Sequence, residues 1–88
     1  NRSAARKKKL TELKDEKRTI IIYESPHRVL VTLRDMQEVF GDIRIACIRE
    51  ATKKFEEALR DKVSSLIEHF SHKKPRGEFV IVFNPRTK

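Results

Sequence analysis

The sequence contains few of the residues that build disulfides, metal sites and glycine-rich loops. Cys47 is its one cysteine, which excludes an internal disulfide and argues against a cysteine-based metal site. Its only glycines are Gly41 and Gly77, so it has no glycine-rich phosphate-binding loop. The longest apolar run is far shorter than the ~20 residues that a membrane-spanning helix needs. We therefore expect a soluble, cytoplasmic protein that binds no membrane.

The sequence also lacks a recognisable set of catalytic or metal-binding side chains. The three histidines are His27, at the start of a predicted helix, and His69 and His72, near the end of another. This arrangement is more typical of surface residues than of metal ligands, and we expect no metal site. No Ser/His/Asp or Cys/His arrangement is supported either. These residues alone do not indicate an autonomous enzyme.

Positive charge is the dominant feature of the composition. The 88 residues contain 21 Lys and Arg against 13 Asp and Glu, giving a net charge of +8. Five of these net charges fall within residues 1–18. Such a balance is typical of proteins that meet phosphate groups. The alternative, a solvated helix face with no partner, remains open at this point.

Two segments have the pattern of helices, and a third is ambiguous. Residues 3–17 are mostly good helix formers with a thin apolar stripe, which predicts a weakly packed helix or one that packs on something absent. Residues 26–40 have apolar side chains at helical spacing, with Ser25 as the predicted N-cap. Residues 51–70 fit either one long helix or a shorter one capped by Asp61.

Strands are predicted between these helices. Residues 19–23 form a continuous β-branched run, which predicts a strand covered on both faces, and residues 43–48 and 78–83 predict two more strands. Residues 71–77, "SHKKPRG", read as a basic loop. Strands that alternate with helices indicate an α/β layer architecture. We expect a small mixed β-sheet flanked by helices.

Polar residues follow the first two predicted strands, where α/β sheets collect ligands. They are Tyr23, Glu24 and Ser25 after the first strand, and Arg49, Glu50, Ala51 and Thr52 after the second. If these strands are parallel neighbours, both groups share one edge of the sheet. A structural explanation is equally open, in which Ser25 and Thr52 cap helices and Glu24 pairs with Arg49.

Three ordered segments resemble a known family: "IIIYESPHRVLVTLRDMQEVFGD", "IREATKKFEE" and "RGEFVIVF". They are similar to the C-terminal part of the small-subunit ribosomal RNA methyltransferases of the tetrapyrrole methylase family, the class III methyltransferases that depend on S-adenosylmethionine. The resemblance spans nearly the whole chain. It implies a sheet of about four strands, with a short strand near residues 56–60 and the shorter helix after Asp61, in the C-terminal domain of the tetrapyrrole methylase fold.

The same resemblance implies a domain organisation. Residues 1–17 would form a basic segment between two domains, and residues 18–88 a C-terminal α/β domain that completes the cofactor cleft. The N-terminal domain, which in the family holds the cofactor loop, would be absent from this chain. We expect the chain alone to be inactive.

The resemblance also implies which residues form the cofactor wall. The family places S-adenosylmethionine against segments that match Tyr23, Glu24, Ser25, Arg49, Glu50, Ala51, Thr52, Gly77, Glu78 and Phe79. Two positions depart from the family pattern, since Ala51 replaces a common Leu and Asp61 stands where a Gly is common. The catalytic base is not identified.

The function implied is methyl transfer to the ribose 2'-hydroxyl of a cytidine in the decoding region of 16S ribosomal RNA, by an enzyme that acts on the 30S subunit as a homodimer. The residues expected to contact RNA phosphates are Arg2, Arg6, Lys7, Lys8, Lys9, His27, Arg28, Lys53 and Lys54. Two alternatives remain, a non-enzymatic RNA-binding α/β module and a methyltransferase that modifies tetrapyrroles. The aromatic residues occupy core-like positions, which disfavours a stacking platform for RNA bases.

Overall fold

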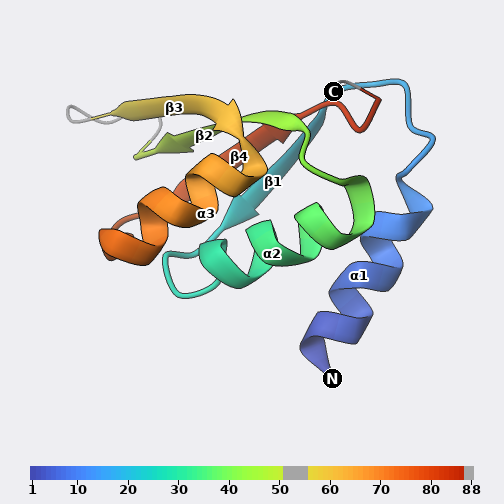
Figure 1. Ribbon diagram of the computed structural model, residues 1–88, viewed down its shortest axis with the longest axis horizontal. Helices are drawn as coiled ribbons and strands as arrows, with labels where there is room; N and C mark the ends of the chain where they lie inside the picture. The colour runs from blue at the N-terminus through green and yellow to red at the C-terminus, as the bar shows by residue number, and fades with distance from the viewer. Residues whose placement is uncertain (51–55, 87–88) are drawn as a thin grey trace.

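One four-stranded sheet carries all three helices on one of its faces (Figure 1). The computed structural model describes residues 1–50 and 56–86. In chain order the elements are α1 (Arg2–Glu12), β1 (Ile20–Glu24), α2 (Val29–Phe40), β2 (Arg44–Arg49), β3 (Glu57–Lys62), α3 (Val63–His72) and β4 (Phe79–Phe83). In Figure 1, α2 lies between α3 and α1, so α1 packs on α2 rather than on the sheet. No helix among these residues is long and apolar enough to cross a membrane.

The strand order is β1-β4-β2-β3, and every pair of neighbours is antiparallel. The predicted α/β class with about four strands is confirmed, and the short strand β3 is present. The condition that the first two strands are neighbours is not met, because β4 pairs with both and lies between them. β1 and β2 still run in the same direction, so their C-terminal ends lie at the same end of the sheet.

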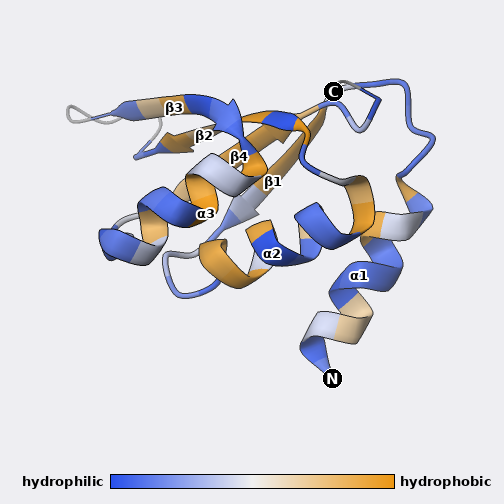
Figure 2. Cartoon of the chain, in the orientation of Figure 1, coloured by the Kyte–Doolittle hydropathy of each residue, from blue (hydrophilic) through white to orange (hydrophobic). Residues whose placement is uncertain are grey.

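Side chains that alternate along the strands give the sheet two different faces. The core lies on the helix-covered face, where α2, α3 and β4 contribute most of the large buried residues: Val29, Leu33, Met36, Val63, Leu66, Phe70, Phe79, Ile81 and Phe83. Figure 2 shows hydrophobic residues, in orange, along the strands and on parts of α2 and α3. The other face carries no helix, and Ile21 is 56% exposed there. The expectation that β1 is covered on both faces is therefore wrong, because β-branched residues favour a strand whether or not both faces are buried.

Cys47 belongs to this core. It is 1% exposed, and burial raises the pKa of its thiol to about 12. The reactive form of cysteine is the thiolate, which burial disfavours. Cys47 is therefore an inert packing residue.

Helix α1 is attached by polar contacts that its thin apolar stripe did not predict. Leu10 is its one buried residue. Ser3 Oγ donates to Asp35 Oδ1 at 2.9 Å, and Arg6 Nη1 contacts Asp35 Oδ2 at 2.6 Å. The helix begins after Asn1, whose side chain accepts from the backbone of Ala4, and it ends earlier than predicted, at Glu12. Contacts with α2 thus supplement its weak hydrophobic attachment.

Helix α3 is capped by a residue far away in the sequence. Asp42 Oδ1 accepts from the backbone N–H of Ser64 at 2.7 Å, and Oδ2 accepts from Ser64 Oγ at 2.6 Å. The prediction that Asp61 caps this helix is wrong, since Asp61 lies in β3 and accepts from the neighbouring backbone of Lys62. Asp42 satisfies a backbone donor that the first turn of the helix leaves free.

We expect Asp42→Ala to lower the free energy of unfolding by about 1 kcal/mol, the usual value of an N-cap. The hydrogen bonds from Ser64 lower the pKa of Asp42, so its contribution is fully present above the ordinary Asp pKa. It is lost as the pH falls through the lowered pKa of the folded state. Thermal melts from pH 7 to pH 2 measure this. Asp61→Ala is the control, and a loss as large as that of Asp42→Ala would contradict the assignment.

Candidate functional site

Three segments of the predicted site meet at one end of the sheet. Glu24, at the end of β1, pairs with Phe79, at the start of β4, and Phe79 pairs on its other side with Arg49, at the end of β2. Glu57 of β3 pairs with Arg49 and completes the row. Residues paired directly across a sheet point to the same face, so these four side chains lie on the helix-covered face. We call this end of the sheet the site end.

Beyond the strands, two hydrogen bonds join the segments that hold Glu50 and Glu78. Glu50 N donates to the Glu78 carbonyl at 2.8 Å, and Glu78 N donates to Glu50 Oε1 at 3.0 Å. Gly77 has a φ of +80°, and a Cβ at this position would overlap the Glu50 carboxylate. Glu50 itself has a φ of +55°, which is uncommon for a residue other than glycine. Both the conformation and the space require glycine at position 77.

Glu24 fastens the end of β1 to α2. Its Oε1 accepts from the backbone N–H of Ser25 at 3.0 Å, and its Oε2 accepts from Thr32 Oγ1 at 2.7 Å. Thr32 is only 1% exposed, so this contact is inside the domain. The pair between Glu24 and Arg49 that the structural explanation predicted is not formed, because Arg49 Nε lies 3.6 Å from Glu57. Glu24 is therefore a positioning residue that holds the turn after β1 against α2.

Tyr23 lies on the opposite face of the sheet from Glu24. Its pairing partner is Val80, which in turn pairs with Ile48, and Tyr23 is 80% exposed. The uncovered face at the site end is therefore apolar and carries one large exposed aromatic ring. A ligand that touches both Tyr23 and Glu24 would have to pass around the end of the sheet.

Ser25 does not cap α2, contrary to the prediction. The helix begins at Val29, and the Ser25 carbonyl, rather than its hydroxyl, accepts from the backbone N–H groups of Arg28 and Val29 at 3.1 and 3.0 Å. Ser25 Oγ is buried and has no hydrogen-bond partner in the part of the chain that the structure describes. A buried hydroxyl without a partner is costly, so this atom is a candidate for contact with a ligand.

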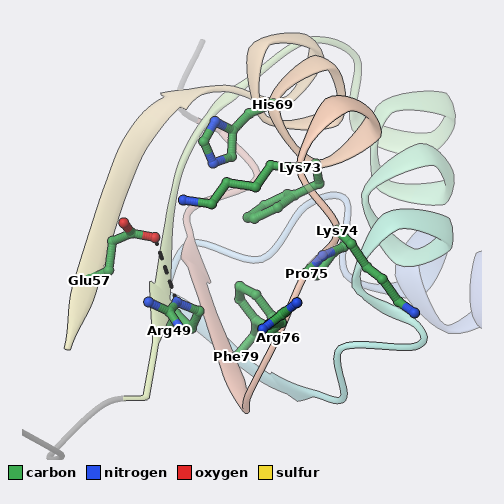
Figure 3. A pocket seen from close by; sticks show the side chains of 9 residues that line it. Arg49, Glu57, His69, Lys73, Lys74, Pro75, Arg76 and Phe79 are labelled. Carbon is green, nitrogen blue, oxygen red and sulfur yellow. Dashed lines mark ion pairs between the residues drawn. The ribbon is translucent and has the colours of Figure 1, made fainter. Parts of the chain in front are cut away.

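A cavity of about 330 Å³ opens on the helix-covered face beside Arg49 (Figure 3). Its lining comes from β2, β3, the end of α3, the following loop and β4: Arg49, Glu57, His69, Phe70, Lys73, Lys74, Pro75, Arg76 and Phe79. Phe70 and Phe79 contact each other edge to face, with ring centroids 5.3 Å apart. Figure 3 shows His69 and Lys73 extending from the end of α3 toward the space above Arg49, whereas Lys74 points away.

The residues predicted to contact RNA fall into different places. Arg6 and Lys7 pair with Asp35 and Glu38 of α2, while the remaining basic residues of this prediction in α1 are exposed: Arg2, Lys8 and Lys9. His27 lines a second cavity together with Lys74 and Arg76. Arg28 is exposed.

Four of the predicted site residues lie outside the described residues: Ala51, Thr52, Lys53 and Lys54. In residues 1–50 and 56–86, no group of three or more His, Cys, Asp or Glu side chains could hold a metal ion.

The site prediction omitted the cations of residues 73–77. Lys74 and Arg76 border both cavities at the site end, and Lys73 borders the one beside Arg49. The basic loop was visible in the sequence, and its position directly before the Gly77–Phe79 segment was the available signal. The sequence did not reveal that the loop returns to Arg49, because this depends on β4 lying beside β2.

The chain was also compared with known proteins. No protein-family model matches it. A protein of Thermotoga maritima is 46% identical over 83 residues, which are 94% of this chain and 37% of that protein. Proteins of Bacillus subtilis and Synechocystis are 47% and 42% identical, each over 88% of this chain. All three are named "Ribosomal RNA small subunit methyltransferase I".

The chain spans only part of these relatives, from 26% of the Bacillus protein to 37% of the Thermotoga protein. The matched region covers almost the whole of this chain. The resemblance seen in the sequence is thereby confirmed: the chain is similar to part of the proteins named ribosomal RNA small subunit methyltransferase I.

Proposed function

We propose that this chain is the part of a ribosomal RNA methyltransferase that supplies one wall of an S-adenosylmethionine cleft and part of the RNA-binding surface. The observation that carries the proposal is the meeting of Glu24, Arg49 and Phe79 at one end of the sheet, in a chain similar to named ribosomal RNA methyltransferases. The remaining two-thirds of such a protein would supply the opposite wall. The substrate is a cytidine ribose 2'-hydroxyl of the small subunit, and the working enzyme is a homodimer.

The residues at the site end fit the cofactor. S-adenosylmethionine presents hydroxyl, amino and carboxylate groups that need hydrogen-bond partners, and Ser25 Oγ is buried without one in the described chain. Tyr23, two residues before Ser25 in the chain, offers an exposed aromatic ring. The segment after β2, with Glu50, and the segment before β4, with Gly77 and Glu78, are held together by two hydrogen bonds. We infer that these residues would hold the cofactor.

When bound, the cofactor supplies an activated methyl group. The residues of this chain contribute binding and orientation, which in a group transfer lower the barrier by holding the reactants in line. Glu24 acts indirectly, since its hydrogen bonds to Ser25 and Thr32 fix the turn after β1. Phe79 is 2% exposed, so its ring offers no stacking surface. No described residue is assigned as the catalytic base.

The cofactor role of Tyr23 is testable by binding. We expect labelled S-adenosylmethionine to bind a mixture of this chain and the unmatched part of the Thermotoga maritima relative, and Tyr23→Ala to weaken this binding about tenfold by removing an exposed ring worth roughly 1–2 kcal/mol. Arg28→Ala should leave cofactor affinity unchanged, since we assign Arg28 to phosphates. Arg60→Ala, at an exposed position of β3, is the matched control. Equal losses at Tyr23 and Arg28 would refute this division of roles.

A further inference from the structure

The cavity beside Arg49 has an unusual concentration of positive charge. Four of its lining residues carry permanent positive charges: Arg49, Lys73, Lys74 and Arg76. Glu57 is the one carboxylate among the lining residues, and it lies 3.6 Å from Arg49 Nε. Within residues 1–50 and 56–86, no acidic group pairs with Lys73, Lys74 or Arg76. Like charges repel, so their convergence is unfavourable unless an anion binds there.

The floor of the cavity increases the attraction for an anion. Phe79 and Phe70 are 2% and 6% exposed and form an apolar base beneath the cations. An apolar floor lowers the local dielectric, which strengthens the interaction between the cations and a bound anion. Because both rings are buried, neither offers a free face on which a nucleic acid base could stack. The cavity therefore suits an anionic group and does not read bases.

The cofactor itself is a poor occupant. S-adenosylmethionine carries a sulfonium and an ammonium group against one carboxylate, so its net charge is positive at neutral pH. Four cations would repel it. A phosphodiester has the matching chemistry, since guanidinium and ammonium groups form charge-assisted hydrogen bonds with phosphate oxygens.

We propose that this cavity binds a backbone phosphate of the RNA substrate. The proposal rests on the proposed function and assigns Lys73, Lys74 and Arg76 to the RNA. It places the phosphate at the site end, beside the Glu24–Phe79–Arg49 row, so that one contact holds the strand next to the cofactor wall. His27 extends the same surface through the second cavity, which Lys74 and Arg76 also line. Phosphate contacts fix the register of a nucleic acid without reading its sequence.

The test is RNA binding by the chain itself, without cofactor. We would measure the affinity for a labelled single-stranded RNA 20-mer across a range of salt concentrations. The double substitution Lys73→Gln with Arg76→Gln should weaken binding about tenfold at low salt. It should also reduce the slope of log K against log salt by about 0.7, since the cavity holds one phosphate and each phosphate contact on a single strand contributes roughly 0.7.

Arg60→Gln with Lys62→Gln removes the same charge from exposed positions of β3 and is the matched control. It should change the affinity less than twofold and leave the slope nearly unchanged. Inorganic phosphate added at constant ionic strength should not displace the RNA, whereas displacement would mean that the cavity prefers free phosphate. That displacement, equal effects of the two double substitutions, or an absence of RNA binding by the unmodified chain would each overturn the proposal.

These results separate the cavity from the methyltransferase assignment. Normal RNA binding by the cavity variant together with methyl transfer would remove the phosphate site and leave the proposed function intact. The opposite pair of results is lost RNA binding in the variant and no methyl transfer by the unmodified chain mixed with the missing part of the enzyme. It would support the phosphate site and remove the proposed function. All four substituted side chains are exposed, so we expect both variants to remain folded. Thermal melts of both variants check this.

Discussion

Arg6→Ala should lower the free energy of unfolding by about 2–4 kcal/mol, because it leaves the buried carboxylate of Asp35 without its cation. The Asp35 side chain is 9% exposed and the Arg6 side chain 19% exposed. Breaking such a pair from one side costs more than the pair contributes, since the remaining charge stays out of water. The melting temperature should fall by about 8–32 °C, given roughly 4–8 °C per kcal/mol for a domain of this size.

Lys7→Ala is the matched control on the same helix. Lys7 contacts Glu38 at 3.0 Å, but the Glu38 side chain is 63% exposed, and exposed pairs contribute about 0–1 kcal/mol. Replacing both Arg6 and Asp35 by Leu should cost less than Arg6→Ala alone, because no charge is then stranded. If Arg6→Ala and Lys7→Ala have equal effects in chemical denaturation, the pair between α1 and α2 is not what attaches the helix.

Gly77→Ala should lower the free energy of unfolding by about 2–3 kcal/mol. Part of the cost is the positive φ of +80°, which penalises a residue with a Cβ by roughly 1–2 kcal/mol. The rest arises because the new Cβ displaces the Glu50 carboxylate, which then loses its hydrogen bond from Glu78 N. The same change should weaken cofactor binding, since it loosens the contact between Glu50, which follows β2, and the loop before β4 at the site end.

A double-mutant cycle isolates the contact with Glu50. Combining Gly77→Ala with Glu50→Ala should cost about 1 kcal/mol less than the sum of the single changes, because the overlap is already absent. Gly41→Ala is the control: Gly41 has a φ of +83° but no atom within 4 Å of its Cβ position. Gly41→Ala and Glu50→Ala should therefore be additive. Additivity at position 77 as well would mean that backbone strain is the whole effect.

The local pattern of the sequence predicted the elements well. Helical spacing located α2, and the apolar run at residues 78–83 located β4. Alternation along a strand also places Tyr23 and Glu24 on opposite faces, although both were assigned to one cofactor wall.

What the sequence could not predict depends on contacts between distant residues. β4 comes last in the chain but lies between β1 and β2, and strand propensity does not encode pairing partners. Asp42 caps a helix 22 positions away, and Arg6 pairs with a carboxylate 29 positions away. The charge of residues 73–77 was visible, but its convergence on Arg49 follows from this strand order. The cap of α3 and the convergence of cations beside Arg49 could therefore be identified only from the three-dimensional structure.

Methyl transfer tests the central claim most directly. Small ribosomal subunits and labelled S-adenosylmethionine would be mixed with this chain and with the separately expressed part of the Thermotoga maritima relative that it does not match. We expect labelled methyl groups in the small-subunit RNA when both are present, little with either alone, and a loss when Tyr23 and Glu78 are both changed to Ala. No transfer, with both parts folded and associated and salt-sensitive RNA binding intact, would contradict the methyltransferase assignment and favour a non-enzymatic RNA-binding module.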